Sequence, residues 1–148
     1  MKNSLLLTIL ILTSLDVIGQ NTIEIKCRVI SKNKTYLPGT HILLLNTTTG
    51  TVTNACGQFL IDIPKDRQGH LVLSMLSEPV YFDLSKLKNE DLDKEIILRV
   101  IPFDHENRIK NKRQYDIKYN CRQSEKTLTF KLTRDNSRRP KIMTIDRQ

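Results

Sequence analysis

The chain contains no tryptophan, and only 5% of its residues are aromatic. Its core must therefore be filled mainly by valine, isoleucine and leucine. Five glycines and five prolines in 148 residues are too few for a fibrous or low-complexity chain. Beyond Leu15, no apolar run approaches the roughly 20 residues that a membrane-spanning helix needs. These absences indicate one globular domain with a modest core and no transmembrane span in the mature chain.

Cysteine is scarce, and its number is odd. The three cysteines, Cys27, Cys56 and Cys121, lie far apart and form no C-x-x-C motif. They cannot all pair within one chain. One disulfide with a free thiol and three reduced cysteines are both open interpretations. A bond between Cys27 and Cys121 would tie the C-terminal part to the rest, whereas Cys56 is expected to fill an exposed turn.

Motifs that carry chemistry are also missing. There is no G-x-S-x-G nucleophile motif and no glycine-rich phosphate loop. His41, His70 and His105 stand in different segments at no metal-ligand spacing. The acidic cluster Glu90, Asp91 and Asp93 lacks the spacing of a calcium loop. We therefore expect no catalytic, metal or cofactor site, and a protein that is not an enzyme.

The first residues have the pattern of a signal peptide. Lys2 precedes an apolar run from Leu5 to Leu15, and modest side chains follow before Gln20. A charged start, a short apolar run and such a cleavage region are typical of export. We predict a signal peptide over residues 1–19 and an exported protein that is periplasmic, outer-membrane associated or secreted.

The next eighty residues alternate between apolar and polar residues, as half-buried strands do. The turn residues between them are Pro38, Gly39, Gly50, Asn54 and Gly57, with one helical turn capped by Ser85. Short strands at this spacing without long helices predict an all-β fold, a small antiparallel Greek-key β-sandwich of about seven strands. The expected strands are residues 22–31, 41–46, 51–53, 58–63, 71–76, 80–84 and 95–101.

The segment from Leu37 to Pro64 resembles the carboxypeptidase regulatory-like domain family, whose members are transthyretin-like or prealbumin-like β-sandwiches. The shared pattern is Leu37-Pro38-Gly39, Ile42, Leu44, Asn46-Thr47, Gly50, Thr53-Asn54, Gly57, Phe59, Ile61 and Ile63. Two departures mark a divergent member: Cys27 and Ser77 stand where the family usually has glycine. The resemblance covers roughly Thr22 to Ile101, within a predicted domain over residues 20–101, and implies a stand-alone, non-catalytic bacterial module.

Positive charge is concentrated after Pro102. Residues 102–148 hold thirteen Lys and Arg against six Asp and Glu, whereas residues 20–101 hold ten against nine. We predict a basic C-terminal extension over 102–148, with a hairpin over 115–133 and a mobile end. The candidate contacts for anionic surfaces are Lys110, Lys112, Arg113, Arg138, Arg139 and Lys141. Solubility alone is the simpler reading of this charge, and nucleic acid is not an expected partner.

Together these patterns favour a module for protein or cell-envelope interaction, with a basic tail for anionic surfaces. Its expected partner is an envelope protein or an anionic surface. An accessory domain of an exported peptidase or outer-membrane receptor system is an alternative, as is a structural component of an envelope assembly. The sequence specifies neither the particular partner nor the oligomeric state.

Overall fold

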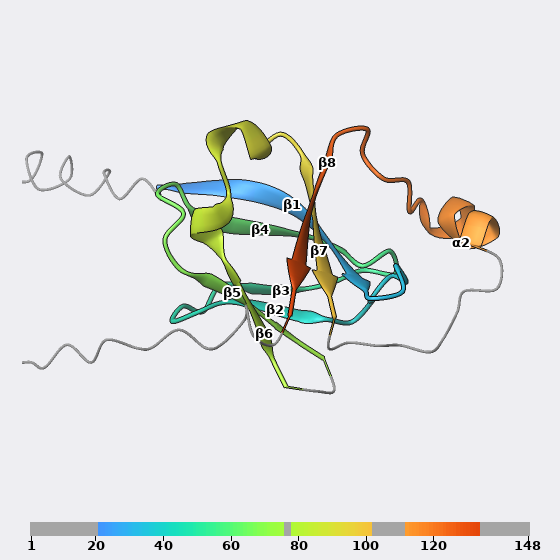
Figure 1. Cartoon of the computed structure of the whole chain (residues 1–148), viewed down its shortest axis with the longest axis horizontal. Coiled ribbons are helices and arrows are strands. Elements are labelled where there is room, and N and C mark those ends of the chain that lie inside the picture. The colour runs from blue at the N-terminus through green and yellow to red at the C-terminus, as the bar shows by residue number, and fades with distance from the viewer. Residues whose placement is uncertain (1–20, 76–77, 102–111, 134–148) are drawn as a thin grey trace, which may run out of the picture.

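The computed structural model describes residues 21–75, 78–101 and 112–133, which form two four-stranded sheets (Figure 1). The first sheet, in the order β4-β1-β7-β8, is made of β1 (Thr22–Ser31), β4 (Gln58–Pro64), β7 (Glu95–Val100) and β8 (Thr127–Leu132). The second, in the order β3-β2-β5-β6, is made of β2 (His41–Leu44), β3 (Gly50–Val52), β5 (His70–Ser74) and β6 (Val80–Asp83). The all-β fold expected from the sequence is confirmed.

The core lies between the two sheets and follows the alternation of the strands. In β1, Ile25, Cys27 and Val29 point inward and are buried, as successive odd positions of a strand must share one face. Phe82 of β6 packs on Phe130 of β8 with ring centroids 4.9 Å apart. Each such buried apolar side chain stabilises the fold by roughly 1.5–3 kcal/mol, so the aliphatic layer compensates for the missing tryptophan.

The apolar run of β2 is covered on one side only. Ile42 and Leu44 are buried, but Leu43 between them remains 42% exposed. The prediction for residues 41–46 placed the strand between two covering layers or at the edge of the core. Because β2 lies inside a sheet whose outer face is open, it alternates like its neighbours despite its continuous apolar sequence.

The sequence predicted an antiparallel sandwich, but the first sheet also contains parallel pairs of strands. There β1 pairs with β7 in parallel, and β7 pairs with β8 in parallel. Parallel neighbours need a long crossover, and the chain between β7 and β8 supplies one. Since Leu132 of β8 is buried against the core, the sandwich continues beyond the boundary that we predicted at Ile101.

The predicted hairpin over 115–133 does not form. Residues 112–119 are the helix α2 (Lys112–Tyr119), and only the second half of the segment is a strand, β8. The alternation of Tyr115, Ile117 and Tyr119 imitated a strand. In the helix, Tyr115 and Tyr119 are four residues apart and share a face, with ring centroids 4.6 Å apart.

Two short 3-10 turns, η2 (Leu84–Lys86) and η3 (Asn89–Asp91), join β6 to β7. The first is capped by the side chain of Asp83, which accepts a hydrogen bond from the Ser85 amide, and not by Ser85 as we predicted. In the part of the chain that is described, no helix is long and apolar enough to cross a bilayer. The predicted signal peptide and the basic residues Lys110, Arg138, Arg139 and Lys141 lie outside the described residues.

Candidate functional site

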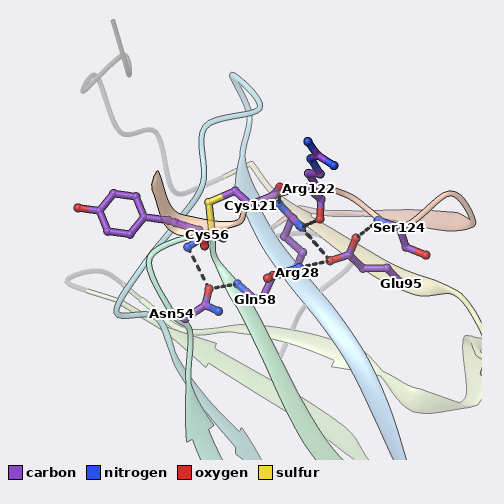
Figure 2. A network of polar contacts seen from close by, with 9 residues as sticks. Arg28, Asn54, Cys56, Gln58, Glu95, Cys121, Arg122 and Ser124 are labelled. Carbon is purple, nitrogen blue, oxygen red and sulfur yellow. Dashed lines mark hydrogen bonds and ion pairs between the residues drawn. A yellow bond between two sulfur atoms is a disulfide. The ribbon is translucent and has the colours of Figure 1, made fainter. Parts of the chain in front are cut away.

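The candidate site is built around Arg28, which projects from β1 on the outer face of the first sheet. Its Nε and Nη2 atoms each lie 3.1 Å from Oε1 of Glu95 on β7. Nη1 donates to the carbonyl of Cys121 at 2.9 Å, and Nη2 donates to the carbonyl of Arg122 at 3.0 Å. Figure 2 shows this side chain reaching toward Glu95 and the segment that follows α2. Arg28 therefore holds residues 121 and 122, in the described part of the crossover between β7 and β8, against the sheet.

Glu95 completes the same network from the other side. It accepts a hydrogen bond from Nε2 of Gln58 at 2.8 Å and one from the backbone N–H of Ser124 at 3.0 Å. Burial acts to raise the pKa of Glu95, but these hydrogen bonds and the charge of Arg28 outweigh it, so its pKa lies below the usual value. Both side chains are fully buried.

A disulfide joins the crossover to the sandwich beside this ion pair. Cys56 and Cys121 are bonded with their Cα atoms 5.1 Å apart (Figure 2). The pairing of Cys27 with Cys121, which the sequence left open as one possibility, does not form, because Cys27 faces the core between the sheets while Cys121 lies over the outer face. Burial, followed by the nearby Glu95 charge, raises the pKa of the Cys27 thiol.

The turn before β4 places Cys56 for this bond. Oδ1 of Asn54 accepts hydrogen bonds from the amides of Cys56 and Gln58, at 2.9 and 3.0 Å. Gly57 has a φ of +69°, and a Cβ there would collide with the carbonyl oxygen of Val29. Only glycine fits such a close approach in this conformation. The predicted turn chemistry at Asn54 and Gly57 thus supports the disulfide.

The other predicted turn residues have smaller roles. Pro38 and Gly39 form the bend before β2, where Gly39 has a φ of +72°. Gly50 is the first residue of β3 and does not supply the positive φ of the β2–β3 loop, which Asn46 adopts at 64°.

Tyrosines fix α2 on the outer face of the sandwich. The hydroxyl of Tyr115 donates to the carbonyl of Ala55 at 2.7 Å, and its ring lies 6.3 Å from that of Tyr36. The guanidinium of Arg28 and the ammonium of Lys112 lie 5.1 and 5.3 Å from the centre of the Tyr36 ring. Together with the ion pair and the disulfide, these contacts hold α2 and the residues that follow it against the first sheet.

Helix α2 and the loop that follows it expose several cations to solvent. Lys112, Arg113 and Arg122, with Asp116 and Ile117, line an open hollow of about 510 Å³. Of the predicted surface contacts, Lys112 and Arg113 are brought together here, and Arg122 joins them. Burial, and then the neighbouring Asp116 carboxylate, raise the pKa of Tyr36 above its ordinary value.

The carboxylates considered for calcium each face a lysine. Asp91 contacts Nζ of Lys94 at 2.9 Å, and the hydrogen bond from Lys94 is the main reason why the pKa of Asp91 is lowered. Asp93 contacts Lys126 at 3.2 Å. Among the described residues, no three His, Cys, Asp or Glu side chains are grouped to hold a metal ion.

The sequence did not single out Arg28, Glu95, Gln58 or Arg122. Arg28 occupies a polar position of an alternating strand, which is the usual place for an exposed charge. The cysteine count was a partial signal for this site. It allowed one disulfide and one free thiol, and so left Cys56 open as the partner of Cys121.

Three comparisons, with protein families, with curated proteins and with solved structures, found no match to this chain. The resemblance to carboxypeptidase regulatory-like domains stays a prediction from the sequence.

Proposed function

We propose that this protein is a non-catalytic, exported β-sandwich module that contacts an anionic surface of the cell envelope through its basic C-terminal part. One observation carries the proposal: Lys112, Arg113 and Arg122 are exposed around one hollow on a crossover that is fastened to the sandwich. Cations held at fixed positions lose less conformational freedom on binding than those of a free tail.

The network behind the hollow supports this role. Arg28 donates a hydrogen bond to the main-chain carbonyl of Arg122, whereas the side chain of Arg122 is exposed to solvent. Lys112 belongs to the helix that Tyr115 fixes to the Ala55 carbonyl. The buried polar groups thus have a positioning role, while the exposed cations are the ones available to a partner.

Export is supported by the disulfide and by the pattern of the first residues. Disulfides persist in oxidising compartments such as the periplasm and the cell exterior. The Cys56–Cys121 bond closes a loop of 65 residues around the site. Together with the predicted signal peptide at residues 1–19, it favours a place in the envelope.

A structural role in an envelope assembly is the second candidate, favoured by β4. This seven-residue strand lies at the edge of the first sheet, and among the described strands it pairs with β1 alone. Leu60 on it is 52% exposed. An edge of this length can accept a strand from another chain. Light scattering would distinguish this role, since a Leu60→Lys variant should reduce any self-association.

The test uses the mature chain, residues 20–148, with its disulfide formed. A deletion of residues 102–148 is unsuitable because it removes β8 and half of the disulfide. Co-sedimentation with vesicles of phosphatidylglycerol and phosphatidylcholine should show binding at low salt that falls steeply at high salt, and none to pure phosphatidylcholine. Absence of binding, or equal binding to both vesicles, would overturn the proposal.

A further inference from the structure

The outward face of α2 combines an exposed apolar side chain with surrounding cations. Tyr115 lies on the face turned toward the sandwich, where its hydroxyl donates to the Ala55 carbonyl, and Ile117, two positions further along the helix, has 71% of its surface exposed. Among the large apolar side chains that the structure describes as exposed, Ile117 is the most exposed. An isoleucine in this position contributes nothing to the core, so its place on the helix calls for another explanation.

The cations lie around Ile117 on two segments. Arg113 lies four residues before it, on the same side of the helix, and Arg122 lines the same hollow from the following loop. Lys112 and Arg113 also occupy the first turn of α2, which has no acidic residue. Positive side chains at the positive end of a helix dipole repel it, and an approaching anion would relieve that repulsion. Among the described residues that line the hollow, Asp116 is the one acid, and together these residues carry a net charge of +2.

We propose that α2 is a membrane-contacting element, in which Ile117 enters the headgroup region of an anionic lipid surface while Arg113 and Arg122 contact lipid phosphates. This inference rests on the proposed function and names its docking face and partner. Binding at a membrane interface combines burial of apolar side chains with electrostatic attraction to anionic lipids, and α2 offers one exposed apolar side chain and neighbouring cations for these two contributions. Each Lys or Arg near an anionic surface strengthens binding about fivefold, so a few cations suffice.

An acidic protein is the competing partner, and the size of the patch disfavours it. Specific protein interfaces bury roughly 800 Å² on each partner and involve about 20 residues a side. The outward surface of an eight-residue helix with one neighbouring arginine is far smaller. A lipid surface needs no shape complementarity, and charge complementarity with one inserted side chain is sufficient.

The absence of tryptophan allows a direct test of insertion. Ile117→Trp places a single tryptophan at the proposed contact, and Val52→Trp places one at a 49% exposed position of β3 in the other sheet. With vesicles that contain phosphatidylglycerol, emission of Ile117→Trp should shift to shorter wavelength and be quenched by brominated acyl chains. Emission of Val52→Trp should not change.

A matched pair of charge variants tests the phosphate contacts. Arg113→Glu/Arg122→Glu should weaken vesicle binding at least tenfold. Lys65→Glu/Lys86→Glu makes the same change of charge and should weaken it less than threefold. Lys65 and Lys86 are both exposed, the first directly after β4 and the second in η2. The end of β4 pairs with the start of β1, which lies on the side of the sandwich away from α2 (Figure 1).

The outcomes separate this inference from the proposed function. If the mature chain binds anionic vesicles but the Ile117→Trp emission is unchanged, or both charge pairs lose equal affinity, the role of α2 is overturned and the proposed function stands. If Arg113→Glu/Arg122→Glu instead weakens binding only to poly-glutamate, the partner is an acidic protein and the lipid assignment is wrong. If no protein binds vesicles, both proposals fail.

Discussion

Arg28 and Glu95 form a fully buried ion pair, with Nη2 3.1 Å from Oε1, that joins β1 to β7 beneath the C-terminal crossover. Removing two charges from water is costly, and a buried pair is tolerated only when further hydrogen bonds satisfy both groups. Here the carbonyls of Cys121 and Arg122, Gln58 and the Ser124 amide provide them. The pair is therefore best understood as the part that positions the crossover.

Truncation of Arg28 should be strongly destabilising. Arg28→Ala leaves the Glu95 carboxylate buried and two carbonyls without their donor, so we expect a loss of about 3–5 kcal/mol in the free energy of unfolding. Urea denaturation measures it, with Lys26→Ala on the exposed face of β1 as the control, expected within about 0.5 kcal/mol of wild type. A loss below about 1 kcal/mol for Arg28→Ala would contradict the burial of an intact pair.

Stability should depend on pH through Glu95. Its pKa in the folded protein is below the ordinary value of 4.5, so the unfolded chain takes up this proton more readily. The stability from Glu95 is therefore complete above about pH 4.5 and is lost as the pH falls through the lower folded pKa. The difference in unfolding free energy between wild type and Glu95→Gln should be largest near neutral pH and shrink in acid. A difference that is constant from pH 7 to pH 3 would show that Glu95 has no lowered pKa.

Loss of the disulfide should release α2 while the sheets remain paired. For a separation of 65 residues, loop-closure entropy predicts that Cys56→Ser/Cys121→Ser lowers stability by up to about 4 kcal/mol. Hydrogen exchange should quicken most at amides of residues 112–122 and less in β1 and β4. A reductant should reproduce the effect in wild type and change nothing in the variant. Uniform quickening across all strands would show that the bond supports the whole fold.

Two glycines with similar backbone angles should respond differently to alanine. Gly57 and Gly39 have φ values of +69° and +72°, but only a Cβ at Gly57 meets another atom, the Val29 carbonyl oxygen. Gly39→Ala should cost about 1 kcal/mol from backbone conformation alone. Gly57→Ala adds a collision with main chain and should cost at least about 2 kcal/mol more, measured by thermal unfolding. Equal costs would argue against the tight approach of this turn to β1.

Much of the sandwich was predictable because the alternation of apolar and polar residues in each strand shows which side chains are buried. The residues expected to point inward in β1 and β4, such as Ile25 and Phe59, do so. The turn at Asn54 and Gly57 was predictable because side-chain hydrogen bonding and a positive φ restrict residue choice. These signals are local, and each is complete within a few residues.

The candidate site could not be predicted in the same way because it depends on long-range contacts. Arg28 is separated from Cys121 by 93 residues, and nothing near Arg28 shows that the segment after α2 will lie against it. The tyrosines of α2 fitted both a strand and a helix, and in the helix Tyr115 contacts Ala55 and Tyr36. The choice of Cys56 over Cys27 depends on which face of the first sheet each residue occupies.

Disulfide mapping tests most directly the central claim that the basic crossover is a fixed part of the sandwich. The mature chain from an oxidising compartment would be digested with trypsin without reduction and analysed by mass spectrometry. We predict that the peptide of residues 35–65 is linked to the peptide of residues 119–122 through Cys56 and Cys121, with Cys27 recovered as a thiol. A bond that includes Cys27, or three free thiols, would contradict the account.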